Sequence, residues 1–258
     1  ESYFGFLGGG HSYIDAEADP ANPILRDRER VGETEYLTDG FTREAVAFIR
    51  QAGPGTRGEH PRPFFLYLAH TMPHIPQHAS AAFAGKSKDG LYGDAVEELD
   101  WSTGAILDLL EELHLAGRTL VIFTSDNGFA LGEHGRVDKR TMYEESIRVP
   151  LIVRYPPLIP RRKVIEQMVL NLDLAPSILD LCGAKALSDI DGQSWKPLLA
   201  GQTNGWRDAF LYFYNYEKEF PYTPNVRGVR TDDWKYVHYP HGDGGPDRHL
   251  AELYNLKN

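Results

Sequence analysis

The sequence predicts an α/β fold with a small antiparallel subdomain at its C-terminal end. Short apolar runs rich in β-forming residues alternate with segments whose apolar residues recur every three or four positions. This alternation is typical of helices packed against a sheet. The apolar runs that predict buried strands are 63–69, 119–124 and 149–155. After about Gly201 the pattern changes to closely spaced strands and turns, which predicts the separate antiparallel part.

The N-terminal part begins with a segment of low regularity. Residues 1–36 are rich in Gly, Pro, Asp and Arg, which predicts a loop. Thr38 and Asp39 are expected to cap the helix that follows, because their short polar side chains can accept hydrogen bonds from the first helical N–H groups. Residues 63–69 have the length and flanking residues of a buried strand. A proline-rich loop around His74 follows this strand.

The middle of the chain carries the most regular patterns. Residues 94–115 predict an amphipathic helix, with Gly117 as its C-terminal stop. The predicted strands at 119–124 and 149–155 are separated by a long loop. A later helix is expected to begin at Asp173 as its N-cap.

The C-terminal part is expected to be a small antiparallel sheet. Its predicted strands are 208–215, 226–230, 234–239 and a last one near 253–256, with a turn at 231–233. We therefore expect two parts, with residues 1–200 belonging to an α/β domain and residues 201–258 to an incomplete antiparallel subdomain.

The charge balance limits the classes of partner. The 258 residues hold 27 Lys and Arg against 37 Asp and Glu, a net charge of −10, which weighs against nucleic acid and anionic membranes. No apolar run approaches the roughly 18 residues of a membrane helix. An anionic substrate would therefore need a site made locally positive by a metal, Lys, Arg or His. The single cysteine, Cys182, excludes an internal disulfide, and we expect it to be a small buried apolar residue.

The strand at 119–124 ends in Ser125, Asp126, Asn127 and Gly128. Open α/β sheets bind ligands where their strands end, and this sequence sets two oxygen-bearing side chains there. Carboxylate and amide oxygens suit Ca²⁺ or Mg²⁺ better than zinc. The tripeptide Asp126-Asn127-Gly128 is also a strong turn signal, and a turn requires no ligand. Calcium takes about 6–8 oxygens, so two residues supply only part of a site.

Basic residues follow this edge of the sheet. Lys139 lies on the loop that leaves it, where an ammonium group can offset charge on a bound oxyanion. Arg140 fits a solvated basic turn better. Glu144 and Arg148 are interpreted as structural, with a possible ion pair between them at helical spacing.

Three histidines, His74, His134 and His11, are candidates for substrate contact, in decreasing order of promise. His74 lies between two prolines that restrict the backbone, as a donor to an anion or leaving group requires. A loop histidine bonded to backbone is the competing interpretation. His134 shares a loop with the basic cluster, His70 is interpreted as structural, and His11 is weakest. No nucleophile elbow and no P-loop occurs.

Together these motifs resemble the type I sulfatases of the alkaline-phosphatase-like superfamily. The resemblance rests on 120–128, 131–135, 139–144 and 147–153, with 63–69 and 73–76 before them and 230–236 and 252–256 after them. It covers nearly the whole chain in the same order. It implies an α/β sandwich with a central mixed sheet flanked by helices, plus a small C-terminal antiparallel sheet with a helix.

The resemblance also implies an activity and roles for residues. It implies hydrolysis of sulfate esters, most commonly on sulfated carbohydrates, with bound Ca²⁺ rather than Mg²⁺. Asp126 and Asn127 would be metal ligands, Lys139 would hold the sulfate, and His74 would bind the sulfate or protonate the leaving oxygen. His134 is a further candidate for substrate binding. Only the resemblance favours a periplasmic or secreted location, and the oligomeric state is left open.

One part of the family pattern is not found in this sequence. The family nucleophile is a formylglycine made from Cys or Ser in a Cys/Ser-x-Pro-x-Arg motif, and no such motif occurs in these 258 residues. The chain resembles the portion downstream of that motif. We therefore expect an N-terminally truncated member of the family, which by itself cannot turn over a sulfate ester.

Two other functions remain open from the sequence. A phosphodiesterase or phosphonate hydrolase of the same superfamily keeps the fold and changes the ester, although Asn127 disfavours the His-containing two-metal sites of phosphatases. An inactive fragment that binds glycans without cleaving them is the second. The loops expected to decide specificity are 8–36, 129–137 and 214–225.

Overall fold

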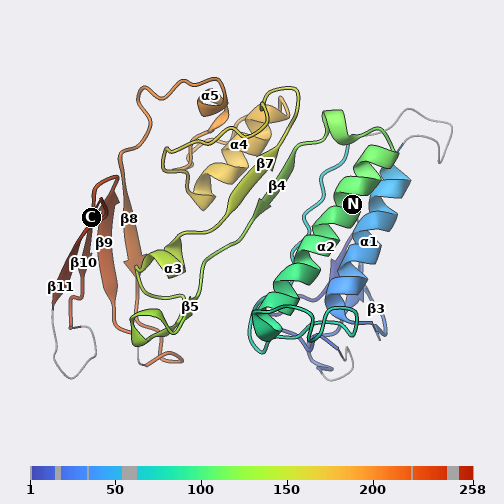
Figure 1. The fold of residues 1–258 in the computed structure, drawn as a ribbon, viewed down its shortest axis with the longest axis horizontal. Helices are drawn as coiled ribbons and strands as arrows, with labels where there is room; N and C mark the ends of the chain where they lie inside the picture. The colour runs from blue at the N-terminus through green and yellow to red at the C-terminus, as the bar shows by residue number, and fades with distance from the viewer. Residues whose placement is uncertain are drawn as a thin grey trace. The chain divides into compact units, whose positions relative to one another are not determined.

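A computed structural model describes residues 2–14, 19–33, 35–53, 63–221, 223–242 and 250–257. The chain forms two compact units, residues 1–119 and residues 120–258, and each is described by itself (Figure 1). No helix among the described residues combines the length and the apolar character that crossing a membrane requires.

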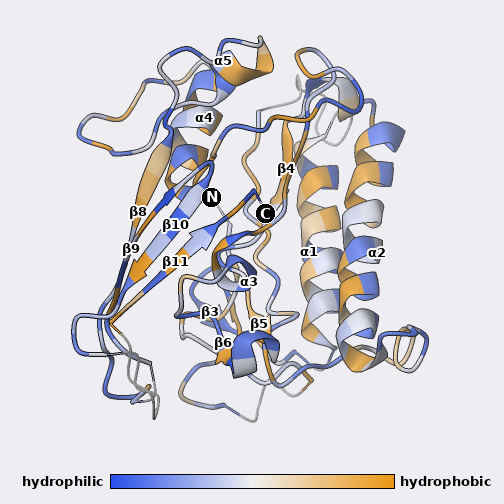
Figure 2. Cartoon of the chain, turned by 60° about the vertical axis from the view of Figure 1, so that its left-hand side comes forward, coloured by the Kyte–Doolittle hydropathy of each residue, from blue (hydrophilic) through white to orange (hydrophobic). Residues whose placement is uncertain are grey.

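The first unit is a pair of long helices beside a small sheet. Helices α1 (Leu37–Ala52) and α2 (Gly90–Glu112) lie side by side (Figures 1 and 2). The sheet consists of β1 (Phe4–Gly5), β2 (Leu25–Arg26) and β3 (Glu29–Arg30), so the predicted loop at 1–36 contains three short strands. The core of this unit includes Ile24, Leu37, Phe41, Met72 and Ala95.

Both helix ends differ from the predictions. Helix α1 begins at Leu37 with Tyr36 as its N-cap residue, so Thr38 and Asp39 lie inside its first turn. Helix α2 ends at Glu112, because His114 adopts a left-handed conformation with φ of 55°. The amide of Leu115 then donates to the carbonyl of Leu110 at 2.7 Å, which closes the helix. The predicted stop, Gly117, lies beyond this point in the short 3₁₀ helix η1 (Ala116–Arg118).

Residues 63–69 do not form the predicted buried strand. They are assigned to no strand, and no described segment pairs with them. Exposure alternates along the segment, and the side chains of Phe65 and Tyr67 are 70% and 81% exposed. Without a neighbouring strand the apolar pattern has no ladder to join, so the prediction of a buried strand is wrong for this structure.

The second unit contains the predicted strand pair of the middle region. Strand β4 (Val121–Thr124) pairs antiparallel with β7 (Leu151–Arg154), with Ile122 opposite Val153. These two residues pack against the buried cluster of Trp195, Leu198 and Leu199. The remaining elements around this pair are the hairpin β5 (Ala130–Leu131) and β6 (Val137–Asp138), the 3₁₀ helices η2 (Glu133–Gly135) and η3 (Asn171–Asp173), and helices α3 (Glu144–Ile147), α4 (Leu174–Leu181) and α5 (Lys196–Leu199).

Helix α4 begins as predicted, because Asp173 is its N-cap residue. The carboxylate of Asp173 is fully buried and forms an ion pair with Arg207, including a contact of 2.7 Å from the second guanidinium nitrogen. The prediction for Cys182 is wrong, since this residue at the end of α4 is exposed.

The C-terminal strands form one antiparallel sheet in the order β11–β10–β9–β8. Its strands are β8 (Ala209–Tyr214), β9 (Val226–Thr231), β10 (Trp234–His238) and β11 (Ala251–Asn255). Val226 of β9 and Val237 of β10 form a buried cluster with Met142 and Tyr239. This confirms the predicted antiparallel C-terminal sheet, while the proposed boundary at residue 200 stays a prediction.

Candidate metal and sulfate site

The strand β4 ends in a turn held by its own polar side chains. The hydroxyl of Ser125 donates to the carbonyl of Asn127 at 2.8 Å, and the amide nitrogen of Asn127 donates to the carbonyl of Gly128 at 2.6 Å. The side chain of Asn171 donates to the carbonyl of Asp126 at 2.6 Å. Asp126 is exposed. The turn therefore fixes the backbone of Asp126 and leaves its carboxylate and the amide oxygen of Asn127 as outward oxygen donors.

Gly128 connects this turn to helix α3. A side chain at Gly128 would place its Cβ 2.0 Å from the carbonyl oxygen of Glu145, so only glycine fits here. The close approach allows the amide of Gly128 to donate to the carbonyl of Ser146 at 2.9 Å. The glycine of the turn signal is thus required by a tertiary contact.

The β5–β6 hairpin brings Lys139 back towards the same turn. Ala130 pairs with Asp138, and this register returns the chain to a point two residues beyond Gly128. The buried side chain of Ser146 also donates to the carbonyl of Asp138 at 3.4 Å. Asp126, Asn127 and Lys139 are therefore collected around α3 within the second unit, although Lys139 is 12 residues from Asn127 in the sequence.

The two basic residues of this loop have different roles. Arg140 places one guanidinium nitrogen 2.7 and 2.6 Å from the two carboxylate oxygens of Asp138, and it stacks on the ring of Phe220. These contacts support the structural interpretation of Arg140. Lys139 donates its backbone amide to Asp138 at 2.7 Å. No acidic side chain among the described residues pairs with its ammonium group, so that group is available to an anion.

His134 lies on the hairpin loop in a left-handed conformation with φ of 56°. Its ring stacks on Tyr143 with the centroids 4.1 Å apart, and its Nε2 lies 3.2 Å from a carboxylate oxygen of Glu145. The imidazole is therefore exposed but oriented by two contacts.

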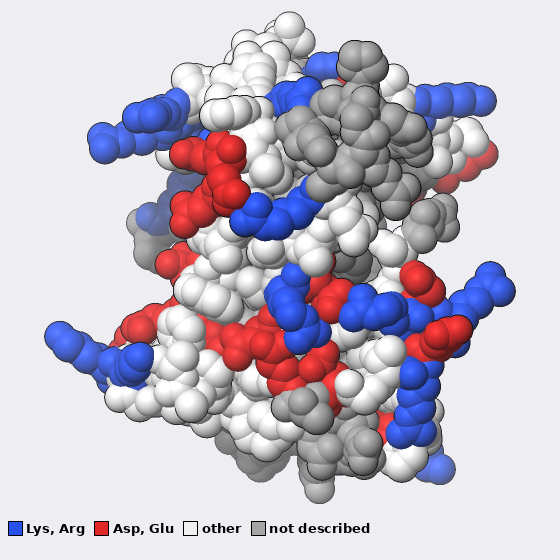
Figure 3. All heavy atoms as spheres, turned by 90° about the vertical axis from the view of Figure 1, so that its right-hand side faces the viewer, with Lys and Arg blue, Asp and Glu red and all other residues white. Residues whose placement is uncertain are grey.

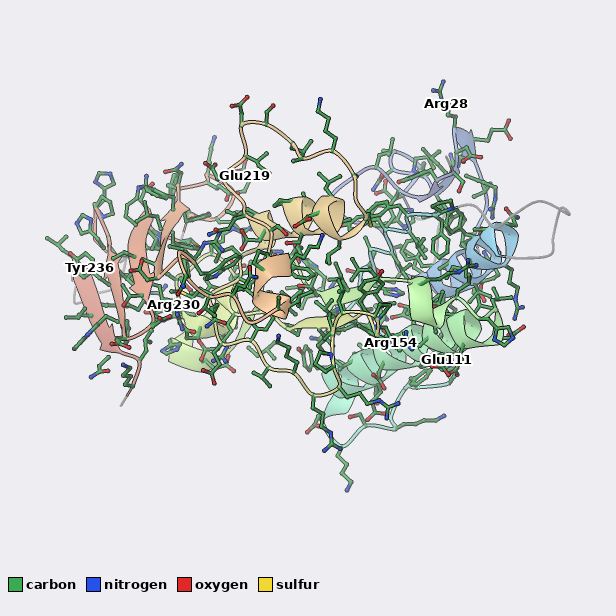
Figure 4. All side chains as sticks on the ribbon, turned by 90° about the horizontal axis from the view of Figure 1, so that it is seen from above. Arg28, Glu111, Arg154, Glu219, Arg230 and Tyr236 are labelled. Atoms are coloured by element: carbon green, nitrogen blue, oxygen red, sulfur yellow. The ribbon has the colours of Figure 1, made fainter. Side chains whose placement is uncertain are left out.

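Glu144 is structural, but its predicted partner is wrong. Its carboxylate pairs with Arg230, which is labelled in Figure 4, at 3.3 Å and with Lys235 at 3.2 Å, both from the C-terminal sheet. The backbone amide of Arg148 donates to the backbone carbonyl of Glu144. Burial raises the pKa of Glu144, but the hydrogen bond from Arg230 and the charge of Lys235 outweigh it and hold that pKa below its usual range. The sequence could not identify these partners because they lie more than 80 residues away.

His74 belongs to the first unit and is exposed. Its Nδ1 lies 2.7 Å from the carbonyl of Ile75, and a carbonyl can only accept, so Nδ1 carries a proton. The Nε2 atom is then the ring nitrogen that can face a ligand. His70, by contrast, is tied to Ser102 at 3.1 Å, and burial lowers the pKa of His70 to about 4, which supports its structural interpretation.

The donor set fits a hard cation in part. Asp126 and Asn127 offer the oxygens that Ca²⁺ prefers. Among the described residues, no group of three or more His, Cys, Asp or Glu side chains forms a complete metal site. On the side of α1 and α2, which Figure 3 shows, Lys and Arg side chains are interspersed with Asp and Glu and form no continuous basic patch among the described residues. The described residues thus offer two oxygen donors, fewer than the 6–8 oxygens that Ca²⁺ usually takes.

Two family models match this chain. The family model described as Sulfatase matches residues 1–184, and the model of the C-terminal part of N-sulphoglucosamine sulphohydrolase matches residues 132–258. The chain therefore belongs to the sulfatase family.

Two curated relatives illustrate the range of the family. Human steryl-sulfatase is 39% identical over 195 residues, covering 70% of this chain and 32% of that protein. The N-acetylglucosamine-6-O-sulfatase of Bacteroides thetaiotaomicron is 42% identical over 172 residues, covering 64% of this chain and 29% of that protein. The chain thus matches about a third of the length of these relatives.

Solved structures give the same fold. The structure of Ps i-CgsB in complex with k-i-k-neocarrahexaose aligns with a TM-score of 0.80 and 27% identity, covering 100% of this chain and 60% of that chain. The phosphonate monoester hydrolase of Agrobacterium radiobacter aligns with a TM-score of 0.55 and 27% identity, covering 65% of this chain and 34% of that one. The alkaline-phosphatase-like α/β fold with an antiparallel C-terminal sheet is thereby confirmed. Family membership supports a metal-using, formylglycine-dependent chemistry in general terms.

Proposed function

We propose that the full-length protein hydrolyses sulfuric esters with the help of calcium, and that its substrate is a sulfated carbohydrate. The observation that carries the proposal is the assembly of Asp126, Asn127 and Lys139 around α3. Two hard oxygen donors, together with a cation that has no acidic partner in the described part of the chain, suit a metal-bound oxyanion. Because the chain belongs to the sulfatase family, we infer that this oxyanion is a sulfate group.

Each residue has a definite task in this proposal. Asp126 and Asn127 would hold Ca²⁺, with the remaining ligands supplied from outside the described residues, and the bound ion would draw negative charge from the sulfate. Lys139 would bind a non-bridging sulfate oxygen. His74 would deliver a proton from Nε2 to the leaving alcohol oxygen. His134 would contact the substrate beyond the sulfate group.

The nucleophile is expected outside these 258 residues. No Cys/Ser-x-Pro-x-Arg motif occurs in them, so the formylglycine of the family would come from another part of the protein. We also propose that residues 1–200 belong to the catalytic domain and residues 201–258 to the C-terminal subdomain, whose Lys235 and Arg230 hold Glu144 of α3.

The carbohydrate assignment is supported by the kind of relatives found. They include enzymes named for N-acetylglucosamine-6-sulfate and N-acetylgalactosamine-6-sulfate groups, together with steryl-sulfatases. We therefore favour sulfated sugars as the substrate class over steroid and simple aryl sulfates.

A phosphonate or phosphodiester hydrolase is the second candidate, since two phosphonate monoester hydrolases share the fold over 65% of this chain. Full-length protein should be assayed in parallel on 4-nitrophenyl sulfate and bis(4-nitrophenyl) phosphate. We expect the sulfate to be hydrolysed faster. A faster phosphate diester would replace the proposed activity with this alternative.

The calcium site can be tested separately from turnover. Calorimetric titration of the full-length protein with Ca²⁺ should show binding that is lost in Asp126→Ala, because its carboxylate is the only charged donor of the turn. Asp189→Ala removes an exposed carboxylate elsewhere in the same unit and should leave binding unchanged. Retained calcium affinity in Asp126→Ala contradicts the assignment. Binding of a sulfated glycan without any hydrolysis would instead support a non-catalytic binding protein.

A further inference from the structure

Helix α2 buries a carboxylate that the proposed mechanism does not use. Glu98 is 1% exposed, and Ser102, one turn further along the same face, is fully buried. The interface of α2 with α1 is thus partly polar, since the hydroxyls of Thr42 on α1 and Ser102 on α2 form a hydrogen bond of 2.6 Å. Buried polar contacts are unusual at the interface of two amphipathic helices, which normally pack apolar residues against each other.

Glu98 is not fully satisfied by its surroundings. Its Oε2 accepts the backbone amide of Ser80 at 3.0 Å, whereas its Oε1 is buried without a hydrogen-bond partner among the described residues. The hydroxyl of Ser80 lies near the same carboxylate, and that of Thr38 lies near Tyr36. Asp94 on the same helix shows the contrast, because its carboxylate accepts the amides of residues 85, 86 and 87 at 2.7 to 3.0 Å.

A buried and partly unsatisfied carboxylate lowers stability relative to an apolar side chain of similar size. Proteins retain such destabilising residues mainly at functional sites. The question is therefore which functional segment Glu98 contacts.

That segment is the loop that carries His74. Its backbone and side chains are held by residues far away in the sequence. Ser102 contacts His70 at 3.1 Å, Tyr13 donates to the carbonyl of Ile75 at 3.4 Å, Tyr36 donates to the carbonyl of His78 at 2.9 Å, and Glu98 accepts from Ser80 at 3.0 Å.

Tyr36 and Glu98 act at the C-terminal side of this loop. Burial raises the pKa of Tyr36 to about 12, and the negative charge of Glu98 adds to that effect, so the hydroxyl keeps its proton and remains a donor. His78 and Ser80 are only two residues apart, so these two hydrogen bonds fix the same short stretch of backbone.

We propose that Glu98 and Tyr36 are positioning residues for His74. The inference rests on the proposed role of His74 as proton donor to the leaving group. Among the described residues, the exposed imidazole of His74 has a hydrogen bond to the carbonyl of Ile75 in its own loop and to no other residue, so its location depends on where the loop is anchored. Misplacing a proton donor by about 1 Å is enough to slow catalysis strongly.

The test compares two leaving groups in the full-length protein. A 4-nitrophenolate ion leaves without a proton, whereas the alkoxide of a sugar requires one. Tyr36→Phe and Glu98→Leu should therefore lower kcat on a monosaccharide 6-O-sulfate by about tenfold or more, and kcat on 4-nitrophenyl sulfate much less. Glu98→Gln, which keeps an acceptor for Ser80, should recover most of the loss.

Two control substitutions lie on α2. Tyr92→Phe and Glu97→Leu make the same changes at exposed positions of α2 and should leave both rates unchanged. Equal losses on both substrates, or no loss in Tyr36→Phe and Glu98→Leu, would overturn the positioning role.

A second measurement separates this inference from the proposed activity. In protein with isotope-labelled histidine, the imidazole resonances of His74 can be assigned by their absence in His74→Gln. They should shift or broaden in Tyr36→Phe and Glu98→Leu and stay in place in the two controls. Unchanged His74 resonances in both test variants overturn the inference, even if the wild type hydrolyses neither substrate and the proposed activity fails.

Discussion

The amide of Gly128 donates to the carbonyl oxygen of Ser146 across 2.9 Å, and this hydrogen bond joins the end of β4 to α3. The same Ser146 bonds through its hydroxyl to Asp138, the residue before Lys139. One buried serine therefore organises the turn with the proposed metal ligands and the loop with the proposed sulfate-binding lysine.

Replacing Gly128 with alanine should disrupt this junction. The new Cβ would lie 2.0 Å from the backbone oxygen of Glu145, which cannot move as a flexible side chain can. We expect a loss of about 1–3 kcal/mol in the free energy of unfolding, measured by chemical denaturation, together with weaker calcium binding. Gly104→Ala in α2 meets open space and should stabilise the protein by roughly 0.5–1 kcal/mol. Equal stability of Gly128→Ala and wild type would show that the contact is not rigid.

Lys139 and Arg140 should respond differently to loss of charge. In the full-length protein, Lys139→Met should lower kcat/KM on a sulfate ester by about 10²-fold or more with little change in stability, because it removes a cation from the developing charge. Arg140→Met should mainly lower stability, since it removes the contacts to Asp138 and Phe220. Steady-state kinetics and thermal unfolding on both variants check this. The reverse pattern would assign the sulfate to Arg140.

His70 should make the first unit sensitive to acid. The hydroxyl of Thr42 donates to the carbonyl of Thr38, and that of Ser102 is therefore left to donate to Thr42. The Nε2 of His70 must then donate to Ser102, so its buried Nδ1 would have to take a second proton without an acceptor. This agrees with the lowering of the pKa of His70 from 6.5 to about 4 by burial.

The sign of the effect follows from linkage. Below pH 6.5 His70 binds a proton in the unfolded chain. In the folded chain it stays neutral down to about pH 4. The stability that depends on neutral His70 is fully present above pH 6.5. The free energy of unfolding then falls by roughly 1.4 kcal/mol per pH unit as the pH drops through this window. Denaturation at pH 7.5 and 5.0 should show a smaller pH difference in His70→Gln than in wild type. An identical difference in the two proteins would place the titrating group elsewhere.

Lys235 should be important for stability despite its charge. It is 3% exposed and pairs with Glu144, so Lys235→Met leaves a half-buried carboxylate with only Arg230 as its partner. We expect a loss of about 2–4 kcal/mol, and a double-mutant cycle with Glu144→Gln should show coupling between the two positions. Lys257→Met breaks an exposed pair with Asp233 and should cost less than about 1 kcal/mol. Similar losses for the two lysines would contradict the buried pairing.

Much of the local structure could be predicted from the sequence. The strand ending at Thr124, the N-cap at Asp173 and the C-terminal antiparallel strands agree with their patterns, because each is signalled by residues close together in the chain. The failures have tertiary causes. Residues 63–69 read as a buried strand, but a strand needs a partner that composition cannot supply. The helical pattern at 94–115 gives no sign that Glu98 is buried, yet it is, with its carboxylate accepting the backbone amide of Ser80.

The sequence by itself determined the family, the chemical types at the proposed site and their order, because oxygen donors, a lysine and a histidine are defined by residue identity. Only the tertiary structure decided which of them are available. In the folded chain Arg140 pairs with Asp138, whereas Lys139 has no acidic partner among the described residues. Glu144 pairs with two basic residues of the C-terminal sheet and not with Arg148. The physical reason is that hydrogen bonds and ion pairs act over a few ångströms in space. The register of a hairpin or the burial of a serine sets those distances, and neither can be obtained from local sequence patterns.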